Sequence, residues 1–140
     1  MSTSDDKRVA PPRNRFVDSE AFWRGTEEGK LMLQYCTDSG RFQHHPRPIS
    51  LYTGKRNLEW RQVSGRGTIY AHTVLRTPSL VRDPDMVPVL LATIELDEGV
   101  RILGNILAAK PEEISVGKRV RLAWDEIAEG VKYPAFELDR

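Results

Sequence analysis

The chain has 140 residues, 39% hydrophobic and 29% charged, which is enough for one domain with a buried apolar core. Its 21 basic and 20 acidic side chains leave a net charge of +1, which argues against a strongly basic nucleic-acid-binding face. The single cysteine excludes an internal disulfide, and no apolar run approaches the roughly 20 residues that span a bilayer. Because the first residues also lack the apolar core of a signal peptide, we expect a cytoplasmic protein without a membrane contact.

The first part of the chain predicts a helix followed by a small β unit. Residues 1–17 are polar and contain prolines, so they are expected to form an extended lead-in. A short helix is predicted over residues 19–30, capped by Asp18 or Ser19 and ended by Gly29. Two strands, at residues 31–36 and 58–63, are expected to flank a long loop rich in turn residues. Helix and β unit together make a segment over residues 18–63.

Residues 64–140 change to a meander of strands. The strands are predicted at residues 67–77, 87–97, 100–107, 118–127 and 131–138, with one helical turn within 110–117. Alternation in the first of these strands predicts that Ile69, Ala71, Thr73 and Leu75 share one face. In the fourth, Val120, Leu122 and Trp124 are predicted to face inward. Five strands with a short helix after the third are the order of an OB-fold barrel, and a sandwich of the same strands is the alternative. The predicted class is therefore α+β, and mainly β.

The segment CTDSGRFQHHPRPISLYTG, residues 36–54, has the spacing of two metal-binding elbows but only one cysteine. Cys36 and Ser39 are three residues apart, ten residues follow, and Ser50 and Thr53 are again three residues apart. A zinc ribbon with four cysteines has paired C-x-x-C elbows of this kind. The spacing of a metal site is present here without most of its ligands.

Taken in order, these pieces resemble a known protein family over residues 16–138. The matching pieces are FWRGTEEGKLMLQYC, GRFQHHPRP, LEWRQVSGRGTIYAHT and LDEGVRILGNI. They are similar to the acyl-CoA-associated OB-fold family with an N-terminal rubredoxin-like zinc ribbon, long catalogued as a domain of unknown function. The resemblance implies a non-catalytic subunit that accompanies a thiolase-fold enzyme or a hot-dog hydratase and helps to shape acyl-CoA access.

The resemblance places the four metal-ligand positions of the family on Cys36, Ser39, Ser50 and Thr53. Hydroxyl groups ionise too reluctantly to replace thiolates, so we expect a ribbon without zinc. Structural zinc contributes on the order of 10 kcal/mol in small fingers, so the ribbon needs another source of order. We expect packing against a partner and a miniature apolar core to supply it. The core candidates are Leu33, Tyr35, Phe42, Leu51, Tyr52 and Trp60.

A coenzyme A ester is the expected ligand, and its phosphates suit arginine forks. The candidate phosphate contacts are Arg47, Lys55, Arg56, Arg61 and Arg66, for which a solvated basic face is the alternative. The candidate anchors for a partner enzyme are Phe22, Trp23 and Phe42, with the ribbon–barrel junction as an alternative place for the first two. No catalytic residue is expected.

Several other residues are candidates for a chemical role, and each also has a purely structural explanation. His44 and His45 are candidate metal ligands with Cys36, or solvated loop histidines; Cys36 is a candidate nucleophile, or a remnant of the ribbon. His72 is a candidate base or groove contact, or an ordinary strand residue. The carboxylates of the loops are explained as turn-forming residues: Asp83, Asp85, Asp97 and Glu98.

Two motifs bear on other functional classes. The Gly-x-Gly of SGRGTIY leads into a strand, so it lacks the helix N-terminus of a dinucleotide site and is expected to allow a sharp entry into the barrel. OB folds often bind nucleic acid, but only fold analogy favours this, and the net charge of +1 opposes it. The alternative functions are a stand-alone acyl-CoA-binding module and, after it, a nucleic-acid-binding protein.

Overall fold

The computed structural model describes residues 17–77, 87–128 and 130–140. A helical turn, η1 (Val17–Ser19), leads into the helix α1 (Glu20–Glu27). Gly29 ends the helix as predicted: its φ is 72°, and the following amide of Lys30 donates to the Gly25 carbonyl at 2.8 Å. Ser19 occupies the N-cap position, which is one of the two that the sequence predicts, but its side chain makes no capping hydrogen bond.

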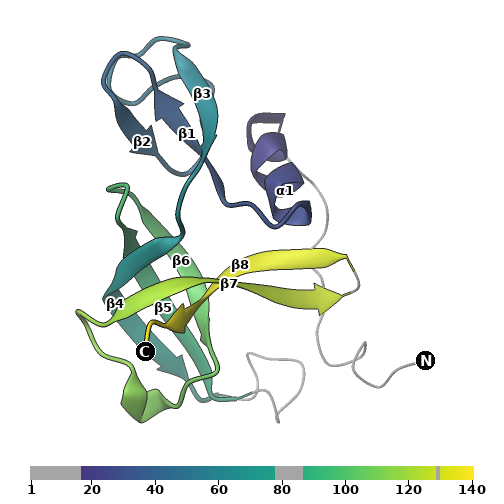
Figure 1. The fold of residues 1–140 in the computed structure, drawn as a ribbon, viewed down its shortest axis with the longest axis vertical. Helices are drawn as coiled ribbons and strands as arrows, with labels where there is room; N and C mark the ends of the chain where they lie inside the picture. Colours follow the sequence, from purple (N-terminus) through teal and green to yellow (C-terminus); the bar gives the residue numbers. More distant parts are fainter. Residues whose placement is uncertain (1–16, 78–86, 129) are drawn as a thin grey trace.

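The β unit that follows is a three-stranded antiparallel sheet, which we call the ribbon (Figure 1). Its strands are β1 (Met32–Cys36), β2 (Arg41–Gln43) and β3 (Leu58–Gln62), in the order β2-β1-β3. The sequence predicted two strands, because the three residues of β2 lie within a stretch of turn signals. Gly40, with a φ of 70°, makes the tight turn that returns the chain beside β1.

The remaining strands form a closed barrel, which confirms the OB-fold prediction and excludes the sandwich. The elements are β4 (Arg66–Leu75), β5 (Val89–Leu96), β6 (Arg101–Leu107), η4 (Pro111–Glu113), β7 (Arg119–Ala128) and β8 (Val131–Leu138). The barrel order is β4-β5-β6-β8-β7, in which β6 and β8 pair in parallel and the other pairs are antiparallel.

Two side-chain directions differ from the sequence prediction. The pairing of β4 with β5 shifts between Ile69 and Ala71, so Ile69 is buried whereas Ala71 is exposed and Val74 packs on the core. A β-bulge of this kind breaks the alternation that a sequence pattern assumes. In β7, Val120 and Leu122 face the core as predicted. Trp124 lies outside the barrel core, with its Nε1 near Gly29 at the end of α1.

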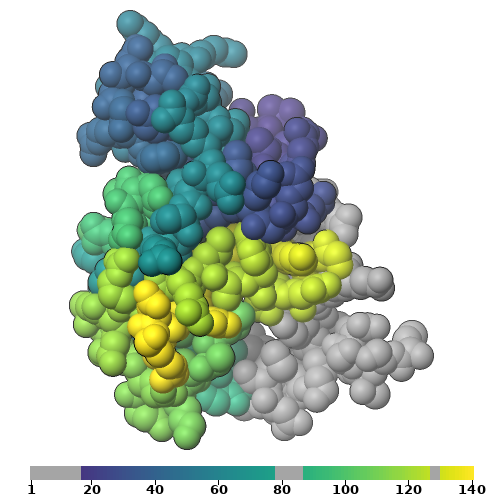
Figure 2. All heavy atoms as spheres, viewed as in Figure 1, coloured from purple at the N-terminus to yellow at the C-terminus, as the bar shows by residue number. Residues whose placement is uncertain are grey.

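One cluster of buried side chains joins the ribbon to the barrel. Phe22 of α1 and Leu31 and Leu33 at the ribbon base belong to the same apolar core as the barrel strands. Figures 1 and 2 show the ribbon projecting from one end of the barrel, with α1 packed beside the junction. No helix within residues 17–77, 87–128 and 130–140 is long and apolar enough to cross a membrane.

Candidate functional site

The four predicted ligand positions form a hydrogen-bonded knuckle around Cys36. The thiol is fully buried, and the amide of Ser39 approaches its Sγ at 3.5 Å. Burial raises the pKa of the Cys36 thiol, but hydrogen bonds from the hydroxyls of Ser39 and Ser50 and from nearby amides outweigh burial and lower the pKa to about 7. Two positions that hold thiolates in a zinc ribbon therefore direct hydrogen bonds to the remaining sulfur here.

The hydroxyls of the second elbow also have protein partners. The Oγ of Ser50 accepts a hydrogen bond from the amide of Tyr52 at 3.1 Å, and the Oγ1 of Thr53 donates to Oδ1 of Asn57 at 2.9 Å. One thiol and three hydroxyls do not fit a structural zinc ion, which requires thiolate or imidazole ligands.

The structure supports neither of the other two roles considered for Cys36, a metal site with the histidines or a nucleophile. Within the described residues, no group of three or more His, Cys, Asp or Glu side chains is placed to hold a metal ion, so His44 and His45 do not join Cys36 in such a site. Because its thiol is sealed from solvent and hydrogen-bonded to serines, Cys36 is not presented to a substrate as a nucleophile.

Two buried glutamines organise the long loop of the ribbon, and the sequence analysis missed them. Gln34 of β1 and Gln43 of β2 are 5% and 2% exposed, and Gln43 Nε2 donates to Gln34 Oε1 at 2.9 Å. Gln34 bonds both the amide and the carbonyl of Arg47, at 2.9 and 2.8 Å. Gln43 bonds the carbonyl of Ile49 at 3.1 Å and the amide of Leu51 at 2.8 Å. These bonds hold the backbone of the loop against the ribbon sheet.

The predicted miniature core of the ribbon is only partly correct. Leu33 is buried, Phe42 stacks edge-on against Tyr35 at 5.0 Å, and Phe42 and Trp60 pack against the main core. Leu51 and Tyr52 do not join them, because Leu51 is 54% exposed and Tyr52 lies on the surface with its ring under Arg41. With Ile49 they form an exposed apolar segment, which we call the 49–52 loop.

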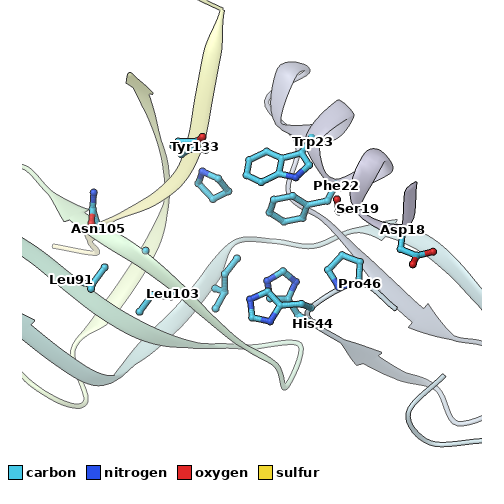
Figure 3. Close-up of a pocket in the computed structure, with 14 residues that line it drawn as sticks. Asp18, Ser19, Phe22, Trp23, His44, Pro46, Leu91, Leu103, Asn105 and Tyr133 are labelled. Carbon is cyan, nitrogen blue, oxygen red and sulfur yellow. The ribbon is translucent and has the colours of Figure 1, made fainter. Parts of the chain in front are cut away.

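A pocket of about 580 Å³ opens where the helix, the ribbon and the barrel meet (Figure 3). Phe22 and Trp23 of α1 face Tyr133 of β8 and Leu103 of β6 across it. Trp23 contacts Phe22 and Tyr133 edge-on, with ring centres 5.0 and 5.4 Å apart. The other lining residues are Asp18, Ser19, His44, His45, Pro46, Leu91, Ile102, Gly104, Asn105 and Pro134.

His44 forms the wall between this pocket and a second one of about 300 Å³ beside Tyr52 and Arg101. Its ring lies 5.6 Å from that of Phe22 and 4.2 Å from that of His45. Burial, with the neighbouring His45, lowers the pKa of His44 to about 4, so the imidazole is neutral at pH 7. Its Nδ1 is buried without a hydrogen-bond partner among the described residues.

The candidate phosphate contacts are all exposed, and they lie on several different segments. Arg47 follows β2, Lys55 and Arg56 lie in the turn before β3, Arg61 lies in β3 and Arg66 begins β4. None of the five lines either pocket described above. The guanidinium of Arg61 is already engaged, because it pairs with Glu59 and stacks on Tyr35 at 3.7 Å.

The remaining predicted residues lie in the following places in the structure. Of the interface candidates, Phe22 and Trp23 lie at the junction and Phe42 in the ribbon, and their contact with a partner stays a prediction. His72 is exposed on β4. Asp97 forms a two-point ion pair with Arg119, which lowers the pKa of its carboxyl. Glu98 accepts a bond from the amide of Ser64 at 2.9 Å and so ties its turn to the ribbon–barrel connection, while Asp83 and Asp85 lie outside the described residues.

Comparison with known proteins finds relatives with the same combination of ribbon and barrel. A family model described as the ChsH2 C-terminal OB-fold domain matches residues 60–125. A DUF35 domain-containing scaffold protein of Pyrococcus furiosus is 31% identical over 108 residues, which cover 77% of this chain and 79% of that protein. The 3-oxo-4,17-pregnadiene-20-carboxyl-CoA hydratase alpha subunit of Mycobacterium tuberculosis is 31% identical over 134 residues, which cover 96% of this chain.

Length and solved structures complete the comparison. The chain spans about two fifths of the hydratase alpha subunits that it matches, 41% in M. tuberculosis and 42% in Thermomonospora curvata. A solved chain described as the Ltp2-ChsH2(DUF35) aldolase superposes with a TM-score of 0.83 at 24% identity, covering 92% of this chain and all (100%) of that one. At that identity the superposition is evidence for the fold alone.

Proposed function

Because this chain belongs to the DUF35 family of acyl-CoA-associated OB-fold proteins, we propose that it is a non-catalytic subunit of an acyl-CoA-processing enzyme. Relatives named as scaffold proteins and as hydratase alpha subunits support an enzyme partner. The non-catalytic part rests on the scaffold name of three relatives and on the sealed thiol of Cys36. The proposed partner is a thiolase-fold or hydratase enzyme in the cytoplasm, where a lone cysteine stays reduced.

The 49–52 loop is the observation that carries this proposal. Ile49, Leu51 and Tyr52 expose apolar side chains next to one another, and Gln43 fixes the loop backbone from beneath. An exposed apolar group on a rigid support is typical of a protein-binding surface, because its burial releases water at little cost in conformational entropy. The metal-free ribbon thus has a role as a docking element.

Co-purification tests the proposal. A tagged chain expressed in its own host is expected to retain an acyl-CoA-processing enzyme at fixed stoichiometry, without zinc in the eluate. Leu51→Glu places a charge in the 49–52 loop and is expected to release the partner. Val116→Glu is the control, because Val116 is 65% exposed and lies outside the ribbon. Equal capture by both variants, or no such enzyme in any eluate, would contradict the proposal.

A stand-alone acyl-CoA-binding module is the second candidate, and the pocket at the junction favours it. Such a module binds the ester with full affinity in the absence of an enzyme and retains no partner. The exposed Arg47, Lys55 and Arg56 remain candidates for contacts to the phosphates of coenzyme A in either case. Replacing them with alanine is expected to weaken binding of the ester in a salt-dependent manner.

A further inference from the structure

The walls of the junction pocket suit an uncharged apolar group. Its volume of about 580 Å³ lies within the range of small-molecule sites. Aromatic and aliphatic side chains from four separate elements meet in it: Phe22, Trp23, Leu91, Leu103, Tyr133 and Pro134. Asn105 adds one amide at the barrel side, which can donate to a carbonyl oxygen.

The charges around the pocket oppose an anion. Among the described residues, its lining contains no Lys or Arg, and its one carboxylate, that of Asp18, lies at the outer edge in Figure 3. His44 supplies no positive charge at pH 7, because burial keeps its imidazole neutral. Among the described lining residues, a phosphate or a free carboxylate would therefore meet no cationic side chain apart from His45, and burial of an unpaired anion in an apolar site is costly.

We infer that this pocket binds the acyl portion of an acyl thioester and excludes the phosphate-bearing portion. The inference rests on the proposed function, which supplies the acyl-CoA ester, and it assigns the two halves of that ester to different places. The acyl group enters between α1 and the barrel, whereas the nucleotide stays outside, where the exposed basic residues and the partner enzyme can reach it.

Calorimetry with the purified chain and a series of thioesters tests this assignment. The probes are N-acetylcysteamine thioesters of increasing chain length, the matching acyl-CoA, free coenzyme A and the matching free fatty acid. The uncharged thioester is expected to bind without the nucleotide, and each added methylene to strengthen binding by about fourfold until the pocket is full. The acyl-CoA is expected to bind more tightly than this thioester only by the salt-dependent contribution of the exposed basic residues. Free coenzyme A and the fatty acid are expected to bind at least tenfold more weakly.

Leu103→Glu is the variant that closes the pocket to apolar groups. Leu103 lies on β6, lines the pocket and is 59% exposed, so a glutamate there is expected to leave folding intact. It should weaken thioester binding by tenfold or more, whereas Val116→Glu, at a similarly exposed position outside the pocket, should leave it unchanged. Binding by coenzyme A alone, no dependence on chain length, or equal affinity in both variants would overturn the inference.

The two proposals fail separately. If Leu103→Glu loses the thioester but still captures the partner enzyme, both stand. If the native chain captures the enzyme but binds no thioester, the pocket assignment is wrong and the accessory function remains. If it binds the thioester through Leu103 but captures no enzyme, the pocket assignment remains and the chain is a stand-alone binding module.

Discussion

Replacing Gln43 with leucine tests whether hydrogen bonds order the ribbon in place of zinc. The side chain is 2% exposed and bonds the Leu51 amide, the Ile49 carbonyl and Gln34. Leucine has a similar shape, so the cavity is small, but the two backbone groups lose their partner and cannot be removed. An unsatisfied buried group costs about 1–3 kcal/mol, and both residues lie near water, so the lower figure applies to each. With the lost bond to Gln34, the expected loss of unfolding free energy is about 3 kcal/mol.

Urea denaturation measures this loss. With a slope of about 1–3 kcal/mol per molar, Gln43→Leu is expected to lower the midpoint by about 1–3 M. Gln62→Leu is the matched control, because Gln62 is an exposed residue of β3 in the same sheet, and its change is expected to stay within about 0.5 kcal/mol. If the two variants have the same midpoint as the native chain, the glutamines do not hold the loop and the ribbon depends on something else.

Three further perturbations follow from the same structure. The triple variant Ser39→Cys, Ser50→Cys and Thr53→Cys places four thiols in the knuckle and should bind one equivalent of zinc, with a melting temperature that a chelator lowers. A folded triple variant without zinc would show that the knuckle does not have tetrahedral geometry. Burial and His45 hold the pKa of His44 at about 4, below its ordinary 6.5, so the unfolded chain takes up more protons between these values; unfolding free energy should therefore fall by up to about 3 kcal/mol from pH 6.5 to 4. His44→Phe should remove that loss, and an unchanged pH profile would refute the assignment. Gly65→Ala should cost at least about 2 kcal/mol more than Gly54→Ala in thermal or urea unfolding, because both glycines have a positive φ but only at Gly65 would the new Cβ lie 2.4 Å from Leu122; equal losses would contradict this packing.

The fold was largely predictable because its signals are local. Turn residues and alternation located the five barrel strands, and Gly29 marked the end of the helix. The bulge after Ile69 was not predictable, because it depends on the register with β5 and leaves no mark on one strand read alone. Leu51 and Tyr52 are apolar or aromatic and so suggest a core, yet both side chains are exposed on the ribbon surface.

The candidate site could be predicted only where its residues recur at a regular spacing in the sequence. The knuckle positions around Cys36 could be found from the two three-residue steps. The pocket could not, because Trp23, His44, Leu103 and Tyr133 come from four segments far apart in the sequence and meet only through the packing of α1 and the ribbon on the barrel. The glutamine pair was overlooked for a different reason: a glutamine in a strand usually faces solvent, and only the loop wrapped over it shows that it is buried.

The expected ribbon without zinc has another source of order, because its base shares the core of the barrel. An independent zinc finger has too little apolar surface to order its backbone, so metal binding supplies most of its folding free energy. Here the ribbon base shares one core with the barrel: Leu31 and Leu33 are fully buried, and the amide of Val63 bonds the carbonyl of Leu31 at 2.9 Å where the chain enters the barrel. The outer loops then remain to be fixed, and Gln34, Gln43 and the hydroxyls around Cys36 make hydrogen bonds there. If hydrogen bonds take the place of zinc in this way, the stability of the loop depends on single side chains such as Gln43, which a four-thiolate site would make dispensable.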